Sequence, residues 1–185
     1  MPPKAKFTRE EVIEAALSIL RAKGRSALTA RALGERLNSS ARPIFTLFSG
    51  MDEILKETEQ AARRVYGEYV SAGLKEKLPF KGVGRSYLRF AREEPKLYQY
   101  LFMREAQGLR ADLLREIDDN FAVILQSVTD GYGLDTKSAE RLYFHLWIYT
   151  QGIASLIASR TCAFTEEETD EMLTEAFIGF LMKAK

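Results

Sequence analysis

The stretch from Leu28 to Leu55, LTARALGERLNSSARPIFTLFSGMDEIL, decides how the rest of the chain is interpreted. It contains two short helical patterns, and each opens with a hydroxyl residue that can cap a helix, Thr29 and Ser40. Ile44 and Phe48 lie four residues apart and should both face inward. Two short helices joined by about three or four residues have the spacing of a helix-turn-helix, whose second helix can enter a DNA major groove. An ordinary helical hairpin fits this segment equally well.

Charge is unevenly distributed along the chain. Residues 1–50 carry nine basic and four acidic side chains, an excess of +5, whereas the whole chain sums to +1. The other 135 residues must therefore sum to −4. A basic N-terminal part suits binding to phosphates, and an acidic remainder discourages non-specific wrapping of nucleic acid. Such an excess is also compatible with plain solvated surface, so it supports DNA binding without proving it.

Residues 7–55 resemble the DNA-binding domain of the tetracycline-repressor (TetR) family of bacterial transcription regulators. The likeness rests on six motifs, whose order and spacing are far more specific than a lone helix-turn-helix: Phe7-Thr8-Arg9-Glu10-Glu11, Ala15-Ala16-Leu17, Gly24, Thr29-Ala30-Arg31, the run Ser40 to Phe48, and Asp52-Glu53. The resemblance implies a homodimeric, cytoplasmic transcription regulator. It further implies a repressor that binds a palindromic operator in double-stranded DNA and is released by a small-molecule effector.

Local signals place the ends of the first elements. Thr8 and Glu11 have the spacing of a capping box that starts the first helix, and Gly24 supplies its left-handed stop. Asn38 stands in the turn where the family commonly has glycine. Because Asn tolerates the left-handed conformation, the turn should survive this change.

The predicted DNA contacts follow from these elements. Thr29 caps a helix whose N-terminal amides attract a phosphate, and Arg31 in its first turn can pair with the same phosphate. A recognition helix beginning at Ser40 places Arg42 where its guanidinium can read guanine, while Pro43 and Thr46 can press on a thymine methyl or a sugar. The full set of predicted DNA-binding residues is Lys4, Lys6, Thr29, Arg31, Ser40, Arg42, Pro43, Phe45 and Thr46.

Three residues depart from the family pattern in ways that weaken phosphate anchoring. Phe45 stands where tyrosine is usual, Leu47 where a polar residue is common, and Met51 where lysine is frequent. Lys4 and Lys6 can compensate as a flexible arm.

The remainder reads as a succession of helices, which predicts an all-α fold of about nine helices. We expect helices over about 52–77, 81–92, 95–105, 110–129, 135–160 and 165–183. Asp135 is the expected cap of the fifth of these, and Thr165 with Glu168 forms a capping box for the last. The predicted domains are residues 1–50 for DNA binding and residues 51–185 for ligand binding and dimerisation.

The body is rich in aromatic residues, most of which must be ordinary core. Trp147-x-x-x-Gln151-Gly152 resembles a Trp-x-x-x-His-Gly element of one TetR subgroup. We expect a cavity for a hydrophobic or aromatic molecule, with Gln107, His145 or Gln151 as polar contacts. The predicted ligand-binding residues are Tyr66, Phe90, Tyr98, Phe102, Phe121, Trp147 and Gln151.

The last two helices carry large apolar residues that would form a four-helix bundle across a two-fold axis, as the resemblance implies. These stripes can alternatively close the protomer's own core. The predicted dimer-interface residues are Leu142, Leu146, Ile153, Leu156, Ile157, Met172, Leu173, Phe177, Phe180 and Leu181.

The sequence argues against an enzyme, a cofactor or a metal. His145 is the only histidine, which rules out a multi-histidine metal site, and Gly82-Val83-Gly84 reads as a loop without the third glycine of a dinucleotide site. The acidic pair Asp118-Asp119 should be solvated. Cys162 is the only cysteine, which excludes an intrachain disulfide and fits a reducing cytoplasm. No stretch resembles a signal peptide or a membrane span, and a helical protein–protein adaptor is the main alternative function.

Overall fold

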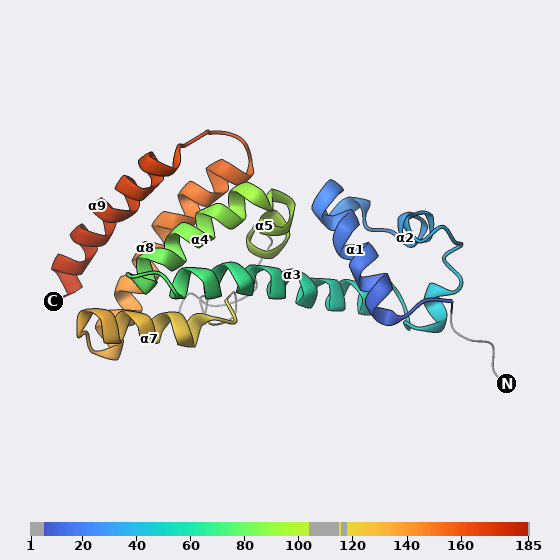
Figure 1. Cartoon of the computed structure of the whole chain (residues 1–185), viewed down its shortest axis with the longest axis horizontal. Helices are drawn as coiled ribbons and strands as arrows, with labels where there is room; N and C mark the ends of the chain where they lie inside the picture. Colours follow the sequence, from blue (N-terminus) through green and yellow to red (C-terminus); the bar gives the residue numbers. More distant parts are fainter. Residues whose placement is uncertain (1–5, 104–114, 116–117, 185) are drawn as a thin grey trace. The chain divides into compact units, whose positions relative to one another are not determined.

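The computed structural model describes residues 6–103, 115 and 118–184 (Figure 1). These residues form eight α-helices and two short 3-10 helices, and no β-strand occurs among them. The all-α prediction is confirmed. The chain divides into two compact units, Met1–Val65 and Tyr66–Lys185, so the boundary falls within a helix rather than in a loop.

The first unit contains α1 (Arg9–Lys23), the 3-10 helix η1 (Arg25–Ala27), α2 (Ala30–Arg36), the 3-10 helix η2 (Ile44–Thr46) and the first part of α3 (Met51–Leu74). Apolar side chains from all of these elements build one core, to which η1 contributes the partly buried Ala27. Its fully buried members include Val12, Ala16, Leu33, Ile44 and Ile54. Because α3 contributes to this core as far as Ala61, its first half belongs to the first unit.

The start and end of α1 follow the sequence signals. The amide of Glu11 donates to Thr8 Oγ1 over 3.1 Å, and the amide of Thr8 donates to Glu11 Oε2 over 2.8 Å. The predicted capping box is therefore confirmed. Gly24 ends the helix with a φ of +82°, a conformation that favours glycine because it has no Cβ atom.

The second unit contains α4 (Pro79–Glu93), α5 (Pro95–Phe102), α7 (Phe121–Tyr132), α8 (Thr136–Ala158) and α9 (Glu166–Ala184). These helices correspond to the predicted ones with ends shifted by a few residues. The helix expected over 110–129 falls partly outside the described residues. No helix in the described part of the chain is long and apolar enough to cross a lipid bilayer.

Predicted caps also define the helices of this unit. Ser138 N donates to Asp135 Oδ1 over 3.0 Å at the start of α8. At the start of α9, Thr165 N donates to Glu168 Oε2 over 2.8 Å and Glu168 N donates to Thr165 Oγ1 over 3.1 Å. Both predictions are confirmed, because each signal depends only on residues three positions apart.

Helices α4, α8 and α9 run side by side, and α5 and α7 also pack on α4 and α8 (Figure 1). Two glycines let the end of α3 approach α4 backbone to backbone. A Cβ atom added at Gly73 would lie 2.5 Å from the carbonyl oxygen of Gly82, and one at Gly82 would lie 2.2 Å from that of Gly73. The expectation that Gly82-Val83-Gly84 is a loop is therefore wrong, since these residues lie inside α4 and Gly82 serves helix packing.

Candidate nucleic-acid interface and ligand cavity

The segment after α2 turns sharply against it. Thr29 caps α2 by accepting from the amide of Ala32 over 3.2 Å. The chain then reverses at Asn38, which has the expected left-handed conformation with a φ of +49°. The amide of Ser39 donates to the carbonyl of Gly34 over 2.8 Å. A Cβ atom at Gly34 would lie 2.8 Å from the carbonyl oxygen of Ser39, so only glycine permits this close approach.

The predicted recognition helix differs from the observed one. No α-helix begins at Ser40, and the regular part is the 3-10 helix Ile44–Thr46. Two features of the sequence explain the difference. Pro43 has no amide to donate, and its carbonyl accepts from both the amide of Thr46 (3.3 Å) and Thr46 Oγ1 (2.7 Å). This carbonyl is therefore drawn to residue i+3, as in a 3-10 helix.

The outer side of this segment presents polar and apolar groups to solvent. Ser40, Arg42 and Thr46 are exposed, and Phe45 is 40% exposed. The guanidinium of Arg42 makes no hydrogen bond or ion pair within the described part of the chain. Ile44 and Phe48 point inward and are buried, as predicted. An uncompensated arginine on an exposed turn suits contact with an anionic partner.

Two further predicted residues lie near the turn or on α2. The ammonium of Lys6 donates to Ser39 Oγ over 2.9 Å, which holds it beside the turn. Arg31 is 90% exposed at its side chain and pairs with Glu35 one turn later on α2. Lys4 lies outside the described residues.

Sequence reasoning missed the role of Arg9, which connects Leu47 and Phe48 to helices α1 and α3 of the first unit. Its guanidinium donates to the carbonyl of Leu47, forms an ion pair with Glu53 over 2.5 Å and pairs with Glu57. It also lies 4.1 Å from the ring centre of Phe48. The hydrogen bond from Arg9, first among several, lowers the pKa of Glu53 to about 2. The spacing of Glu53 and Glu57, one turn apart on α3, was the available signal.

A cavity of about 340 Å³ lies within the second unit. Apolar and aromatic side chains from α4, α7, α8 and α9 form most of its wall. Its lining comprises Tyr66, Leu78, Phe80, Lys81, Val83, Gly84, Tyr87, Asp118, Tyr132, Tyr143, Leu146, Trp147, Thr150, Leu173, Thr174, Phe177 and Ile178.

Two of the seven predicted ligand-binding residues, Tyr66 and Trp147, line this cavity. Three others belong to a cluster of rings in mutual contact. The ring centre of Phe102 lies 5.0 Å from that of Tyr66 and 5.5 Å from that of Tyr98, and Phe90 lies 5.3 Å from Tyr66. Phe90 and Tyr98 are therefore core residues, and the half-buried Phe102 packs against them.

The remaining predicted ligand-binding and polar contact residues also lie elsewhere. Phe121 stacks on Tyr143 at 5.7 Å. Gln151 accepts from the hydroxyl of Tyr98 over 2.8 Å and donates to the carbonyl of Phe102 over 3.2 Å, so its amide is occupied within the core. His145 packs against the ring of Phe180 at 5.4 Å. Gln107 lies outside the described residues.

The polar group that sequence reasoning missed in the cavity is Asp118. It is 2% exposed, so the expectation of a solvated side chain is wrong. Its carboxylate accepts from the hydroxyl of Tyr66 over 2.8 Å and from the amide of Asn120 over 2.9 Å. Burial raises its pKa. The signal was ambiguous, because an Asp-Asp pair gives no indication of which side chain turns inward.

Two cavity-lining side chains have buried polar atoms without a partner. Neither the hydroxyl of Tyr143 nor Nε1 of Trp147 has a hydrogen-bond partner among the described residues. Burial, and then the nearby charge of Asp118, raise the pKa of Tyr143 well above its ordinary value. Both groups are therefore available to a molecule that enters the cavity.

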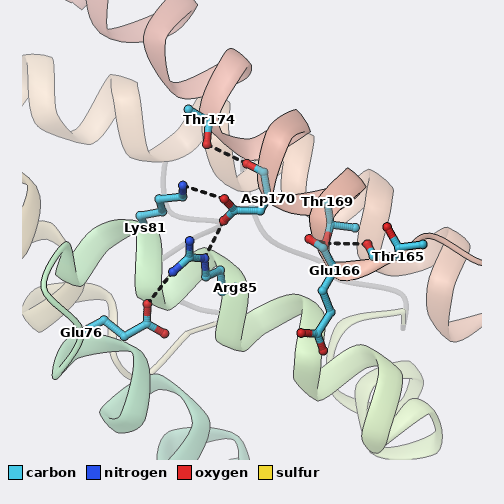
Figure 2. Close-up of polar contacts among 8 residues, drawn as sticks. All are labelled: Glu76, Lys81, Arg85, Thr165, Glu166, Thr169, Asp170 and Thr174. Carbon is cyan, nitrogen blue, oxygen red and sulfur yellow. Dashed lines mark hydrogen bonds and ion pairs between the residues drawn. The ribbon is translucent and has the colours of Figure 1, made fainter.

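An ion cluster (Glu76, Lys81, Arg85 and Asp170) joins α4 to α9 beside the cavity. Figure 2 shows the carboxylate of Asp170 between Lys81 and Arg85, with ion-pair distances of 2.9 and 2.5 Å. Arg85 also reaches Glu76 over 3.0 Å. The hydrogen bond from Arg85, and then that from Lys81, lower the pKa of Asp170 to about 2. Since Lys81 also lines the cavity, this cluster borders one of its walls.

The predicted dimer residues separate into two groups. Leu142, Leu146, Ile153 and Leu173 are at most 6% exposed within the protomer, so they are core residues and are withdrawn from the predicted interface. The others retain some exposure: Leu156 (40%), with Ile157, Met172, Phe177, Phe180 and Leu181 half-buried.

Exposed apolar residues that were not predicted accompany Leu156 on the outer side of these helices. Ile148 on α8 and Met182 on α9 are 50% and 77% exposed, whereas Ile178, which is 52% exposed, lines the cavity. Cβ atoms added at Gly152 and Gly179 would meet nothing within 4 Å. We call the set Ile148, Gly152, Leu156, Gly179 and Met182 the outer face.

The fold and these sites define a helical protein with a small N-terminal unit, in which a turn and the 3-10 helix η2 follow α2, and a larger helical unit around a cavity. Residues 80–178, more than half of the chain, match the family described as tetracyclin repressor-like, C-terminal domain. The chain belongs to this TetR family of transcriptional regulators. Members of this family are generally not enzymes. No curated protein matches the sequence.

Solved structures share the fold at low sequence identity. A transcriptional regulator from Rhodococcus sp. Rha1 is 15% identical with a TM-score of 0.59, over 96% of this chain and 97% of that one. A TetR transcriptional regulator from Streptomyces coelicolor is 16% identical with a TM-score of 0.59, over 97% of this chain and all of that one (100%).

Proposed function

We propose that this regulator is a repressor that binds a palindromic DNA operator as a homodimer and is released when a small apolar or aromatic molecule occupies the cavity. The observation that carries the proposal is the free guanidinium of Arg42 on an exposed turn whose position is set by Gly34. A guanidinium pairs bidentately with O6 and N7 of guanine, and it enters that contact without first giving up a partner in the protein.

The surroundings of Arg42 support a DNA contact. Lys6 is held at the same turn by Ser39 and adds a positive charge suited to phosphate. Phe45 is exposed although it is apolar, which suits contact with a sugar or a thymine methyl. Arg31 can exchange its exposed pair with Glu35 for a phosphate at little cost, because exposed ion pairs contribute little.

The outer face supports the dimer. Ile148, Gly152 and Leu156 recur at intervals of four residues on α8, and Gly179 and Met182 lie three residues apart on α9. The two glycines permit close approach of helix backbones. Two copies of this face would form a four-helix interface related by a two-fold axis, and a stable one needs to bury more than about 1,000 Å² in total. The same axis would require an operator with two equivalent half-sites.

The effector part rests on the cavity. A volume of about 340 Å³ lies in the range of small-molecule sites, and its wall is mostly apolar with a few polar groups. In a dimer, an effector would release DNA by favouring a spacing between the two copies of residues 40–48 that no longer matches the operator. To weaken DNA binding tenfold it must prefer the non-binding state by about 1.4 kcal/mol.

The proposal is tested by selecting bound sequences from a pool of random DNA duplexes with the full chain, and by measuring its mass in solution. We expect a palindromic consensus with half-sites about one duplex turn (~34 Å) or a multiple of it apart, together with the mass of a dimer. Retention on heparin without any selected consensus would instead favour non-specific binding. If neither heparin nor duplex DNA retains the protein, the result would favour the alternative function, a helical protein–protein adaptor.

A further inference from the structure

We propose that the effector is an apolar molecule carrying one protonated amine, and that Asp118 binds this amine inside the cavity. The inference rests on the proposed function, in which the cavity is the effector site. It goes further by naming the charge of the effector and the residue that selects it.

Asp118 is the only charged side chain that is fully buried among the described residues. Its hydrogen bonds come from neutral groups, the hydroxyl of Tyr66 and the backbone and side-chain amides of Asn120. No basic side chain in the described part of the chain pairs with it. A buried carboxylate without a counter-ion is costly, and a cation that enters beside it removes that cost.

Among the described residues that line the cavity, the one basic side chain, Lys81, is already neutralised. The ammonium of Lys81 binds Asp170 over 2.9 Å, and Asp170 in turn binds Arg85 (Figure 2). The described part of the lining therefore offers an incoming molecule a carboxylate but no free cation. An anionic effector would meet repulsion from Asp118, whereas an ammonium group would be attracted.

The side chains around Asp118 also suit an ammonium group. Tyr66 and Tyr143 line the cavity next to it, with Trp147 on the same helix as Tyr143, and aromatic faces attract cations. The hydroxyl of Tyr143 has no partner within the described residues and can accept a second N–H from the amine. Carboxylate, unpaired hydroxyl and rings thus form one recognition site.

Trp147 makes the test direct, because it is the only tryptophan in the chain and it lines the cavity. Its fluorescence, excited at a wavelength that phenyl groups do not absorb, reports entry of a ligand. The probes are 4-phenylbutylamine, 4-phenylbutan-1-ol and 4-phenylbutanoate, which share one apolar part and are cationic, neutral and anionic at pH 7. We expect the amine to bind at least about tenfold more tightly than the alcohol, and the carboxylate most weakly.

Asp118→Asn keeps the size and one acceptor oxygen but removes the charge. We expect it to abolish the preference for the amine while leaving binding of the alcohol within about twofold. The matched control is Asp119→Asn, which removes the same charge from an exposed neighbour and should keep the preference. Thermal melts followed by circular dichroism verify that both variants fold.

The outcomes separate the inference from the proposed function. Equal binding of amine and alcohol by the unmodified protein, or tightest binding of the carboxylate, would overturn the inference and leave the effector cavity standing. No change of Trp147 fluorescence with any probe would count against both the inference and the effector cavity. DNA binding and dimerisation are measured separately and would be unaffected by either result.

Discussion

The carboxylate of Asp170 on α9 lies 2.5 Å from Nε of Arg85 on α4, so one ion pair joins two helices whose residues are 85 positions apart. Lys81, one turn before Arg85, binds the same carboxylate. Since residues of both helices also line the cavity, this ion cluster fixes the distance between two of its walls.

The first prediction is that Asp170→Asn destabilises the protein by about 1 kcal/mol at pH 7. The lowering of its pKa from 3.8 to about 2 would by itself correspond to a larger loss of stability. The side chain is 34% exposed, however, so solvent partly screens the ion pair. Urea unfolding measures the change. The control is Glu171→Gln, which removes a charge from an exposed neighbour on α9.

The same pair gives a pH dependence with a definite sign. Because the folded pKa lies below the unfolded one, the contribution of Asp170 is fully present above about pH 4 and is lost as the pH falls toward 2. The difference in unfolding free energy between the unmodified protein and Asp170→Asn should therefore shrink over that interval. A difference that stays constant from pH 6 to pH 3 would contradict the assignment.

The second prediction concerns Gly34. Replacing it with alanine places a Cβ atom 2.8 Å from the carbonyl oxygen of Ser39, and backbone cannot yield as a flexible side chain does. We expect a loss of about 1–3 kcal/mol of stability and weaker DNA binding, because the turn before Arg42 must move. Gly50→Ala is the control, since its Cβ atom would meet nothing within 4 Å. Equal effects of the two substitutions on DNA binding would argue against the role of Gly34.

The third prediction separates base reading from phosphate binding. Arg42→Ala should cost about 1–3 kcal/mol of operator affinity and relax the preference at one base pair in each half-site. Lys6→Ala should weaken binding to all sequences and flatten its dependence on salt. Arg141→Ala, on the second unit, removes the same charge and should change neither property. An unchanged consensus after Arg42→Ala would refute its assigned role.

Features that depend on a few neighbouring residues were predictable from the sequence. The caps by Thr8, Asp135 and Thr165, and the left-handed Asn38, each follow from side chains and amides within three residues of one another. The segment of residues 40–48 was harder to predict, because its 3-10 geometry results from competition for a single carbonyl, that of Pro43.

The cavity was only partly predictable, because helical periodicity tells which side chains face inward but not what they face. Phe90 and Tyr98 are fully buried, yet they meet other rings rather than empty space. Asp118 turns inward although its neighbour Asp119 is exposed. Periodicity also failed to separate core from interface among the predicted dimer residues. Leu142 and Ile153 face the core of the protomer, whereas Ile148 lies on the opposite side of α8.

The last prediction addresses the outer face. Ile148→Glu or Met182→Glu should leave the protomer folded, because both side chains are at least half exposed in it. In a dimer these positions would be buried, and an unpaired carboxylate there would be costly. We therefore expect light scattering to give the mass of one 21.0 kDa chain instead of two, and the affinity for a palindromic operator to fall toward that of a half-site. Val123→Glu on α7 supplies the control, since Val123 is equally exposed at 50% but lies outside this face. If both outer-face variants kept the mass of a dimer, the protomers would have to associate through another surface.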